Sequence, residues 1–243
     1  MTDPDARHAH KTVHRRQDGF KAHIAIEPDT GIVTDCELTR ASGAHSGDAQ
    51  VGPGLVAGEP EPTVVLGDSA YGSGEARAEL ADAGHQAVIK PIPLRPAVPG
   101  GFTLDDFTIN HDDASVTCPN GVTRPIAPGR TVTFGAICDG CPLRALCTAG
   151  KKGRTVKVHE HEALLRAARH TAETPEFQEV YRRHRPMVER SIAWLTRGNR
   201  RVRYRGVSKN DHWLHHRVAA LNLRRLLVLG LTRSNGTWVI GTA

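Results

Sequence analysis

Hydrophobic and polar residues alternate along residues 19–27, as in a strand with one buried face. The apolar positions that share one side are Phe20, Ala22, Ile24 and Ile26. Turn-forming residues 28–31 follow, and a second β-rich run extends from Ile32 to Leu38. Two such runs joined by a short turn predict a β-hairpin over residues 19–39, with one face on the core.

A strand, a helix and another strand are predicted next. The apolar run at residues 63–67 is suited to a strand buried on both faces, and it ends at Asp68. Ser73 as the N-cap and Gly84 as the C-terminal stop bracket a helix. Residues 87–90 form the second strand. Because a helical crossover joins them, the two strands should be parallel, with the loops at their carboxyl ends available for chemistry.

The composition changes at Pro91. From there to about Gly153 the chain is rich in proline and glycine and holds four of the five cysteines. We interpret this stretch as an inserted subdomain. Helical spacing returns afterwards and predicts helices over residues 160–170, 175–197 and 212–231. Pro186 lies inside the second of these and is expected to kink or restart it.

Composition describes an ordinary globular chain, with 39% hydrophobic and 24% charged residues among 243. These values exclude disorder, collagen and coiled coil. The longest apolar run near the C-terminus, Leu226–Leu231, is far shorter than the roughly 20 residues of a membrane helix, so no membrane association is expected. The acidic start lacks a secretory signal, which predicts a cytoplasmic protein with reduced or metal-bound cysteines.

Charge is distributed unevenly along the chain. Residues 1–150 hold 12 Lys and Arg against 19 Asp and Glu, whereas residues 151–243 hold 20 against 7. A polycationic C-terminal part favours a polyanionic partner, most simply the nucleic-acid backbone. A solvated, solubilising surface is the alternative.

Two acids are candidates for metal chemistry. Asp68 follows a buried strand, and Glu189 lies in the middle of a predicted helix, on one ridge with Tyr181 and Arg185. If the two carboxylates meet, they can bind Mg²⁺ or Mn²⁺, and two such ions support attack on a phosphodiester. The alternatives are a turn-capping aspartate and an intrahelical Arg185–Glu189 ion pair.

Four cysteines form a second candidate site. Cys138 and Cys141 make a C-x-x-C knuckle, flanked by Cys118 and Cys147. Four thiolates suit a closed, structural Zn²⁺ site, although the five-residue gap before Cys147 is irregular. Reduced, partly buried thiols or an iron–sulfur cluster are the alternatives. Cys36 is expected to be a small core residue of the hairpin.

A basic segment follows the helix that carries Glu189. Its cations, which we predict to contact DNA, are Arg197, Arg200, Arg201, Arg203, Arg205 and Lys209. Tyr204 lies among them and offers one stacking surface. A solvated basic loop is the alternative. His212, His215 and His216 have some metal-like spacing, but we expect packing and capping roles for them.

Several motifs together resemble the DDE transposases of bacterial insertion sequences, and most of all the IS1182 type of the IS4/IS5-like group. They are residues 3–7 (DPDAR), 19–23 (GFKAH), 67–72 (GDSAYG), the four-cysteine segment, and residues 185–190 (RPMVER) through 203–206 (RYRG). The resemblance covers nearly the whole chain in the expected order. It implies a ribonuclease H-like α/β core, two divalent metal ions, and cleavage and joining of DNA at transposon ends. By position, Asp68 matches the family's second acid and Glu189 its third.

The chain departs from the family pattern in two ways. Tyr181 lies four residues before Arg185 instead of three, and Thr196 stands near the place of a lysine. The first acid of the family lies on a strand before the hairpin, upstream of Asp3, and no such strand is expected here. We therefore expect a C-terminal portion of a transposase that lacks the first catalytic aspartate. The missing strand would also leave a sheet edge exposed.

These interpretations combine into an α/β, ribonuclease H-like core truncated at its N-terminal strand, with a Cys-rich insertion and C-terminal helices. The expected parts are residues 1–92 (first part of the core), 93–155 (insertion) and 156–243 (helical part with the DNA-facing segment). The expected partner is DNA, bound by a homodimer, in the cytoplasm of a bacterium at its nucleoid. The rival functions are a non-catalytic DNA-binding module, a metal-dependent nuclease of the same fold, and an inactive remnant.

Overall fold

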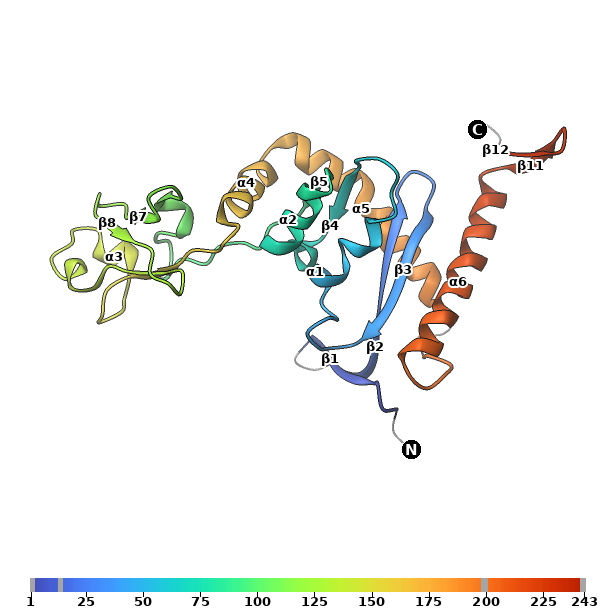
Figure 1. The fold of residues 1–243 in the computed structure, drawn as a ribbon, viewed down its shortest axis with the longest axis horizontal. Helices are drawn as coiled ribbons and strands as arrows, with labels where there is room; N and C mark the ends of the chain where they lie inside the picture. The colour runs from blue at the N-terminus through green and yellow to red at the C-terminus, as the bar shows by residue number, and fades with distance from the viewer. Residues whose placement is uncertain (1–2, 13–14, 198–200, 241–243) are drawn as a thin grey trace. The chain divides into compact units, whose positions relative to one another are not determined.

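The computed structural model describes residues 3–12, 15–197 and 201–240. The chain divides into two compact units, coloured by residue number in Figure 1. The first comprises Met1–Lys90 and Ala172–Ala243, and the second comprises Pro91–Thr171. The chain therefore leaves the first unit once and returns to it, as an insertion does. None of the described helices is long and apolar enough to cross a membrane.

The first unit opens with an antiparallel sheet in the order β1-β2-β3, formed by Arg7–Thr12, Arg15–Glu27 and Ile32–Arg40. Strands β2 and β3 make the hairpin that the alternation predicted, with Phe20 opposite Arg40 and a bulge between Ala25 and Ile26. The hairpin is confirmed.

A strand that we did not predict, β1, precedes the hairpin and lies after Asp3, so it is not the acid-bearing strand that we expected to be missing. It pairs antiparallel with β2, with Arg7 opposite Gly19, and so covers an edge that we expected to be exposed. Histidines, a lysine and an arginine gave this segment no apolar alternation, and its strand form comes from pairing with β2. Its sequence, RHAHKT, holds no carboxylate.

A parallel pair follows the hairpin. Strands β4 (Val64–Gly67) and β5 (Gln86–Ile89) pair in register, and helix α2 (Gly74–Asp82) connects them. Ser73 caps the helix by accepting a hydrogen bond from Ala76 N at 3.1 Å. The predicted β-α-β unit and cap are confirmed. Strand β4 is less buried than expected, because Val64 is 47% exposed.

Two 22-residue helices complete this unit. Helix α5 spans Pro175–Thr196 and continues through Pro186, so the predicted restart of the helix there does not occur. Helix α6 spans Val207–Val228 and begins five residues before the predicted start. Its first amides are capped from far away in the sequence: Gly206 N donates to Asp3 at 3.0 Å and Val207 N to Asp5 at 3.1 Å.

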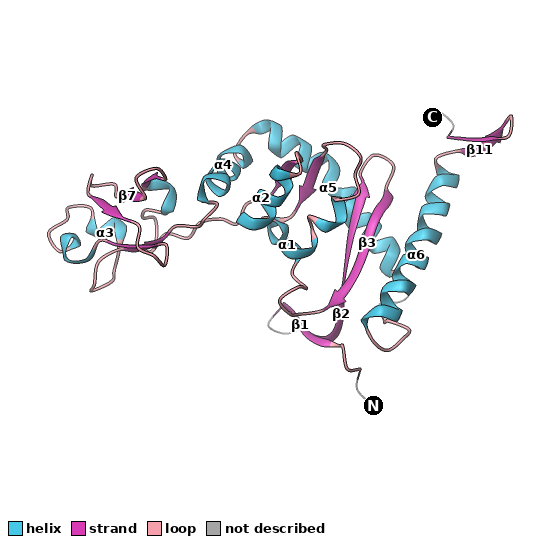
Figure 2. Cartoon of the chain, viewed as in Figure 1, coloured by secondary structure: helices cyan, strands magenta, loops and turns pink. Residues whose placement is uncertain are grey.

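Helix α6 lies along β3, as Figure 2 shows, and the core of the first unit fills the space between them. Its buried members come from β3, α5 and α6, and they are Val33, Cys36, Leu38, Leu195, Leu214 and Val218. Phe20, Ile24 and Ile26, the apolar side of the predicted hairpin, pack against this cluster. Burial of these side chains is the main stabilising term for the sheet–helix layer.

The chain ends in a hairpin that we did not predict. Strands β11 (Leu231–Ser234) and β12 (Thr237–Ile240) pair around Asn235 and Gly236, both at positive φ. Asn-Gly is the usual sequence of such a tight turn. Our predicted helix ran to Leu231 instead, whereas Gly230, at φ +78°, follows its actual end.

The second unit is built from short elements, where the sequence showed no periodicity. Its strands are β6 (Thr108–Asn110), β7 (Ser115–Thr117), β8 (Thr123–Pro125), β9 (Thr131–Thr133) and β10 (Thr155–Lys157). They form a three-stranded sheet, β6-β7-β8, and a β9-β10 pair. The α-helices of this unit are α3 (Arg144–Cys147) and α4 (Glu162–Ala172). The remaining α-helix, α1 (Asp48–Val51), belongs to the first unit.

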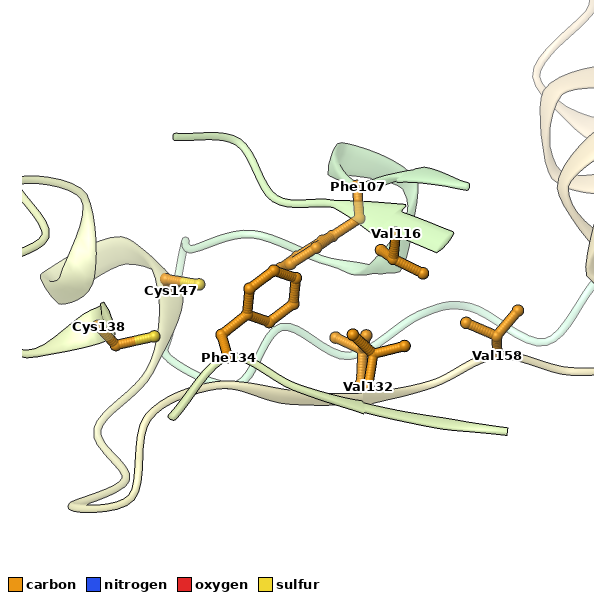
Figure 3. Close-up of a cluster of buried hydrophobic side chains, with 8 residues drawn as sticks. Phe107, Val116, Val132, Phe134, Cys138, Cys147 and Val158 are labelled. Carbon is orange, nitrogen blue, oxygen red and sulfur yellow. The ribbon is translucent and has the colours of Figure 1, made fainter. Parts of the chain in front are cut away.

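A separate apolar core holds this unit together. Figure 3 shows Phe107, Val116, Val132, Phe134 and Val158 packed side by side, with Cys138 and Cys147 at one end. The rings of Phe107 and Phe134 lie 5.8 Å apart, a tilted arrangement favourable for aromatic pairs. The Cys-rich segment therefore has a hydrophobic centre of its own.

An ion network fixes helix α4 within this unit. Arg169 donates to both oxygens of Asp105, at 2.6 and 2.7 Å, and to Glu162, which is only 3% exposed. Arg166 donates to the carbonyls of Leu104 and Phe107, each at 2.9 Å. Burial alone would raise the pKa of Asp105, but the hydrogen bonds from Arg169 outweigh it and lower that pKa.

Candidate functional site

Asp68 lies where the sequence placed it, directly after β4. It is the N-cap of a short 3₁₀ turn, Ser69–Tyr71, and its Oδ1 accepts from Ala70 N at 2.9 Å. The residue is exposed. The capping role that we weighed as an alternative is thus present, and the carboxylate still faces solvent at the carboxyl end of a parallel strand, where ligands commonly bind.

A second acid, Asp48, contacts Tyr71 of this turn, and the sequence analysis did not identify it. Asp48 pairs with Lys21, and its Oδ1 lies 3.2 Å from Nδ1 of the buried His23. His23 Nε2 in turn lies 3.0 Å from the hydroxyl of Thr39. Burial alone would raise the pKa of Asp48, but hydrogen bonds from His23 and Lys21 outweigh it and lower that pKa to about 2.

Tyr71 connects this cluster to the Asp68 turn. Burial, and then the negative charges of Asp48 and Asp68, raise the pKa of the Tyr71 phenol, which also hydrogen-bonds to Asp48. A side chain at Gly52 would stand 2.8 Å from the Tyr71 ring, so the tyrosine is packed tightly. The only sequence signal for this arrangement was Lys21 and His23 alternating along β2 with the apolar positions.

The low pKa of Asp48 predicts a pH-dependent loss of stability. Since the folded-state pKa lies below the ordinary 3.8, ionised Asp48 stabilises the fold above about pH 4, and this contribution disappears as the pH falls toward 2. After allowance for solvent screening, we expect a contribution of about 1–2 kcal/mol. Urea unfolding of wild type and Asp48→Asn between pH 2 and 6 measures it. The two proteins should converge at low pH; a constant difference would contradict the assignment.

Glu189, Arg185 and Tyr181 lie along one ridge of α5, with the first two exposed and Tyr181 half-buried. Arg185 Nε is 2.9 Å from Glu189 Oε1, and Arg185 Nη1 donates to the Tyr181 hydroxyl at 2.9 Å. The hydrogen bond to Glu189 is the main cause that raises the pKa of Arg185. The predicted ridge and the alternative i,i+4 ion pair are therefore both present.

The structure does not assemble a magnesium site from these acids. In the part of the chain that the structure describes, no hydrogen bond or ion pair joins Asp68 to Glu189. Among those same residues, no three His, Cys, Asp or Glu side chains are grouped as ligands of one metal ion. Carboxylates are the right donors for Mg²⁺, but these two as they stand do not enclose one.

The basic segment is exposed wherever it is described. Arg197 is the C-cap of α5, and Arg201, Arg203, Arg205 and Lys209 follow with exposed side chains. Arg200 lies outside the described residues. Cations gathered in so short an exposed segment give a strong local positive potential, which attracts phosphates.

The four cysteines of the second unit surround one small cavity. Cys118, Cys138, Cys141 and Cys147 all line it, and its volume is about 20 Å³. Burial is the main cause that raises the pKa of Cys147, and the three other thiols act in the same direction. Arg154 N donates to Cys138 Sγ at 3.4 Å. The cavity has room for about one water-sized group, and among the described residues the four thiols are not grouped as ligands of one metal ion.

Cys36 is a buried core residue of β3, as predicted. Its Sγ lies 3.4 Å from His215 Nδ1, and His215 Nε2 lies 3.6 Å from Asp211. Burial, with the charges of Asp35 and Asp211, raises the pKa of the Cys36 thiol to about 12. A thiol so weakly acidic is a poor nucleophile, so this Cys–His–Asp series is part of the packing between β3 and α6.

Comparison with known proteins gives one match. Residues 117–227 match the family model described as "Transposase DDE domain". No curated protein and no solved structure matches the chain. The matched region contains Glu189 with its ridge, the four cysteines and the basic segment, whereas Asp68 lies before it. The match covers a little under half of the chain and supports a transposase of the DDE type.

Proposed function

We propose that this protein acts on DNA as a transposase of the DDE type, close to the IS1182 type, with a ribonuclease H-like arrangement of β1–β5, α5 and α6. The observation that carries the proposal is the exposed basic segment that directly follows the Glu189 helix, inside the region that matches the DDE domain. The cations of that segment hold the DNA backbone, at transposon ends and at the target, with two copies of the chain acting together.

Asp68 and Glu189 are the two acids that this chain contributes to a divalent metal site. Bound Mg²⁺ would stabilise the charge that develops at the attacked phosphodiester. Arg185 orients Glu189 through a direct hydrogen bond, and Tyr181 acts through its own hydrogen bond with Arg185.

Neutralising the basic segment should weaken DNA binding. For Arg203→Ala/Arg205→Ala we expect the affinity for duplex DNA to fall by about 10-fold at moderate salt, and the salt slope to fall by about two, one for each lost phosphate contact. Fluorescence anisotropy over a salt series measures both quantities. Arg95→Ala, an exposed cation elsewhere in the chain, is the matched control and should leave binding unchanged. Equal affinities for the double variant and the wild type would contradict the proposal.

A non-catalytic DNA-binding role is the second candidate, and the absence of an assembled carboxylate site among the described residues favours it. The two candidates differ in their response to Mg²⁺ and Asp68. The transposase predicts Mg²⁺-dependent strand cleavage and joining that Asp68→Asn and Glu189→Gln each abolish, with DNA binding retained. Salt-sensitive binding without any cleavage would establish the second candidate, and cleavage without joining would indicate a nuclease.

For the four-cysteine cavity we propose a structural Zn²⁺ site. Four cysteines line one cavity of about 20 Å³, and their thiolates would supply the tetrathiolate donor set that zinc prefers. With four protein ligands no position remains for substrate, so the role of the ion is to stabilise the fold. The Arg154 amide that donates to Cys138 resembles the hydrogen bonds that commonly support ligating sulfurs.

A further inference from the structure

An open hollow lies at the start of helix α6, beside the basic segment. Its volume is about 490 Å³, within the range of small-ligand sites. Its lining includes Tyr204, Lys209, His212, Trp213 and His216. Ser208 and Asp211 complete the lining, so four rings stand beside one cation, one carboxylate and one hydroxyl. The rings offer flat, polarizable walls.

The backbone of Tyr204 is held in place by the buried side chain of Asn210. Asn210, which is fully buried, accepts from Tyr204 N at 2.9 Å and donates to Tyr204 O at 2.7 Å. The same amide donates to Gly206 O at 2.8 Å. The backbone at Tyr204 is therefore fixed by both of its polar groups, while the side chain remains 48% exposed. A backbone already fixed beneath an exposed ring lowers the entropy cost of binding a flat ligand there.

Trp213 and the two histidines provide further walls. The guanidinium of Arg217 lies 5.0 Å from the centroid of the Trp213 ring, a cation–π contact that restrains the indole. His212 and His216 meet edge to face, with ring centroids 4.8 Å apart. Imidazole nitrogens in such a wall can donate or accept hydrogen bonds toward a polar ring.

We propose that this hollow binds a single unpaired nucleobase of the DNA that the basic segment holds. The inference rests on the proposed function and adds a base-binding subsite to it. Aromatic side chains stack on any base, because every base has a π-face. A base in a regular duplex has both faces covered by its neighbours, so only an unpaired one can enter. Lys209 stands in the lining to meet the phosphate of the same nucleotide.

The test compares two DNA duplexes that differ only in one extra, unpaired 2-aminopurine at the centre. We expect the wild-type protein to bind the bulged duplex about 5- to 100-fold more tightly than the fully paired one, and to quench the 2-aminopurine fluorescence by stacking. Tyr204→Ala should bring this affinity ratio close to one. Tyr204→Phe, which keeps the ring, is the matched control and should preserve the ratio and the quenching.

Trp213→Ala removes a second aromatic wall of the hollow, and it too should lower the ratio of the two affinities. A wild-type ratio near one, or a ratio that survives Tyr204→Ala and Trp213→Ala, would overturn the inference. In that case salt-dependent binding of the paired duplex would still leave the proposed function standing. If neither duplex is bound, the proposed function itself fails and the subsite with it.

Discussion

Replacing Arg169 with methionine is expected to destabilise the Pro91–Thr171 unit by about 3–5 kcal/mol, because it leaves a buried carboxylate without its cation. Glu162 is 3% exposed and receives its ion pair from Arg169. Without that partner the Glu162 carboxylate is left buried with no compensating cation, which is costly. Hydrogen–deuterium exchange of peptides from this unit measures the loss directly, without interference from the rest of the chain.

A double variant separates the charge effect from a simple packing defect. The double variant Glu162→Leu/Arg169→Met removes the buried charge itself and should regain at least half of the stability. A loss below about 1 kcal/mol in the single variant would show that the network is not stabilising.

Loss of the proposed zinc is the second large effect that we expect. The wild-type chain should carry one zinc ion by elemental analysis, and Cys138→Ser or Cys147→Ser should reduce that content to background. Structural zinc binds small domains with an apparent free energy of about 10–16 kcal/mol. The unit also has an apolar core of its own. Removal of the zinc should therefore open the unit locally and not unfold it entirely. Hydrogen exchange around Cys138 should then rise sharply.

Cys36→Ser is the matched control, because Cys36 belongs to the core of the other unit. It should leave the zinc content unchanged. Thiol alkylation gives an independent measurement: with zinc bound, the four cysteines of the cavity should resist modification, and a chelator should expose them. A zinc-free wild-type protein whose four thiols react equally with and without chelator would contradict the site.

Local patterns predicted the parts of the fold whose side chains alternate or repeat. The hairpin followed from Phe20, Ile24 and Ile26, which do pack on the core. The parallel pair followed from two apolar runs separated by a capped helix, with Ser73 in the predicted role. Such elements are readable because a strand or an amphipathic helix buries residues at a fixed spacing. The assignments of Asp68 and Glu189 as catalytic acids stay predictions.

Interactions between residues far apart in the sequence could not be predicted from local spacing patterns. Strand β1 has no alternation of its own and exists because β2 offers it an edge. Helix α6 begins early because Asp3 and Asp5, some 200 residues away, accept hydrogen bonds from the amides at its start. The sequence alone gave no reason to assign Asp3 or Asp5 a structural role. A helix cap supplied by so distant a segment produces no local spacing pattern that could predict it.

The sequence by itself determined the β2–β3 hairpin, the β-α-β unit and the long C-terminal helices, and that positive charge gathers after the Glu189 helix. The tertiary structure alone decided which residues of separate segments meet. It brought Asp48, His23 and Tyr71 together behind the Asp68 turn, gathered four cysteines around one cavity, and set Tyr204 on the buried Asn210. The reason is physical: secondary structure follows from local spacing, whereas buried polar contacts depend on how separate segments pack, and each is kept because leaving it unpaired is costly.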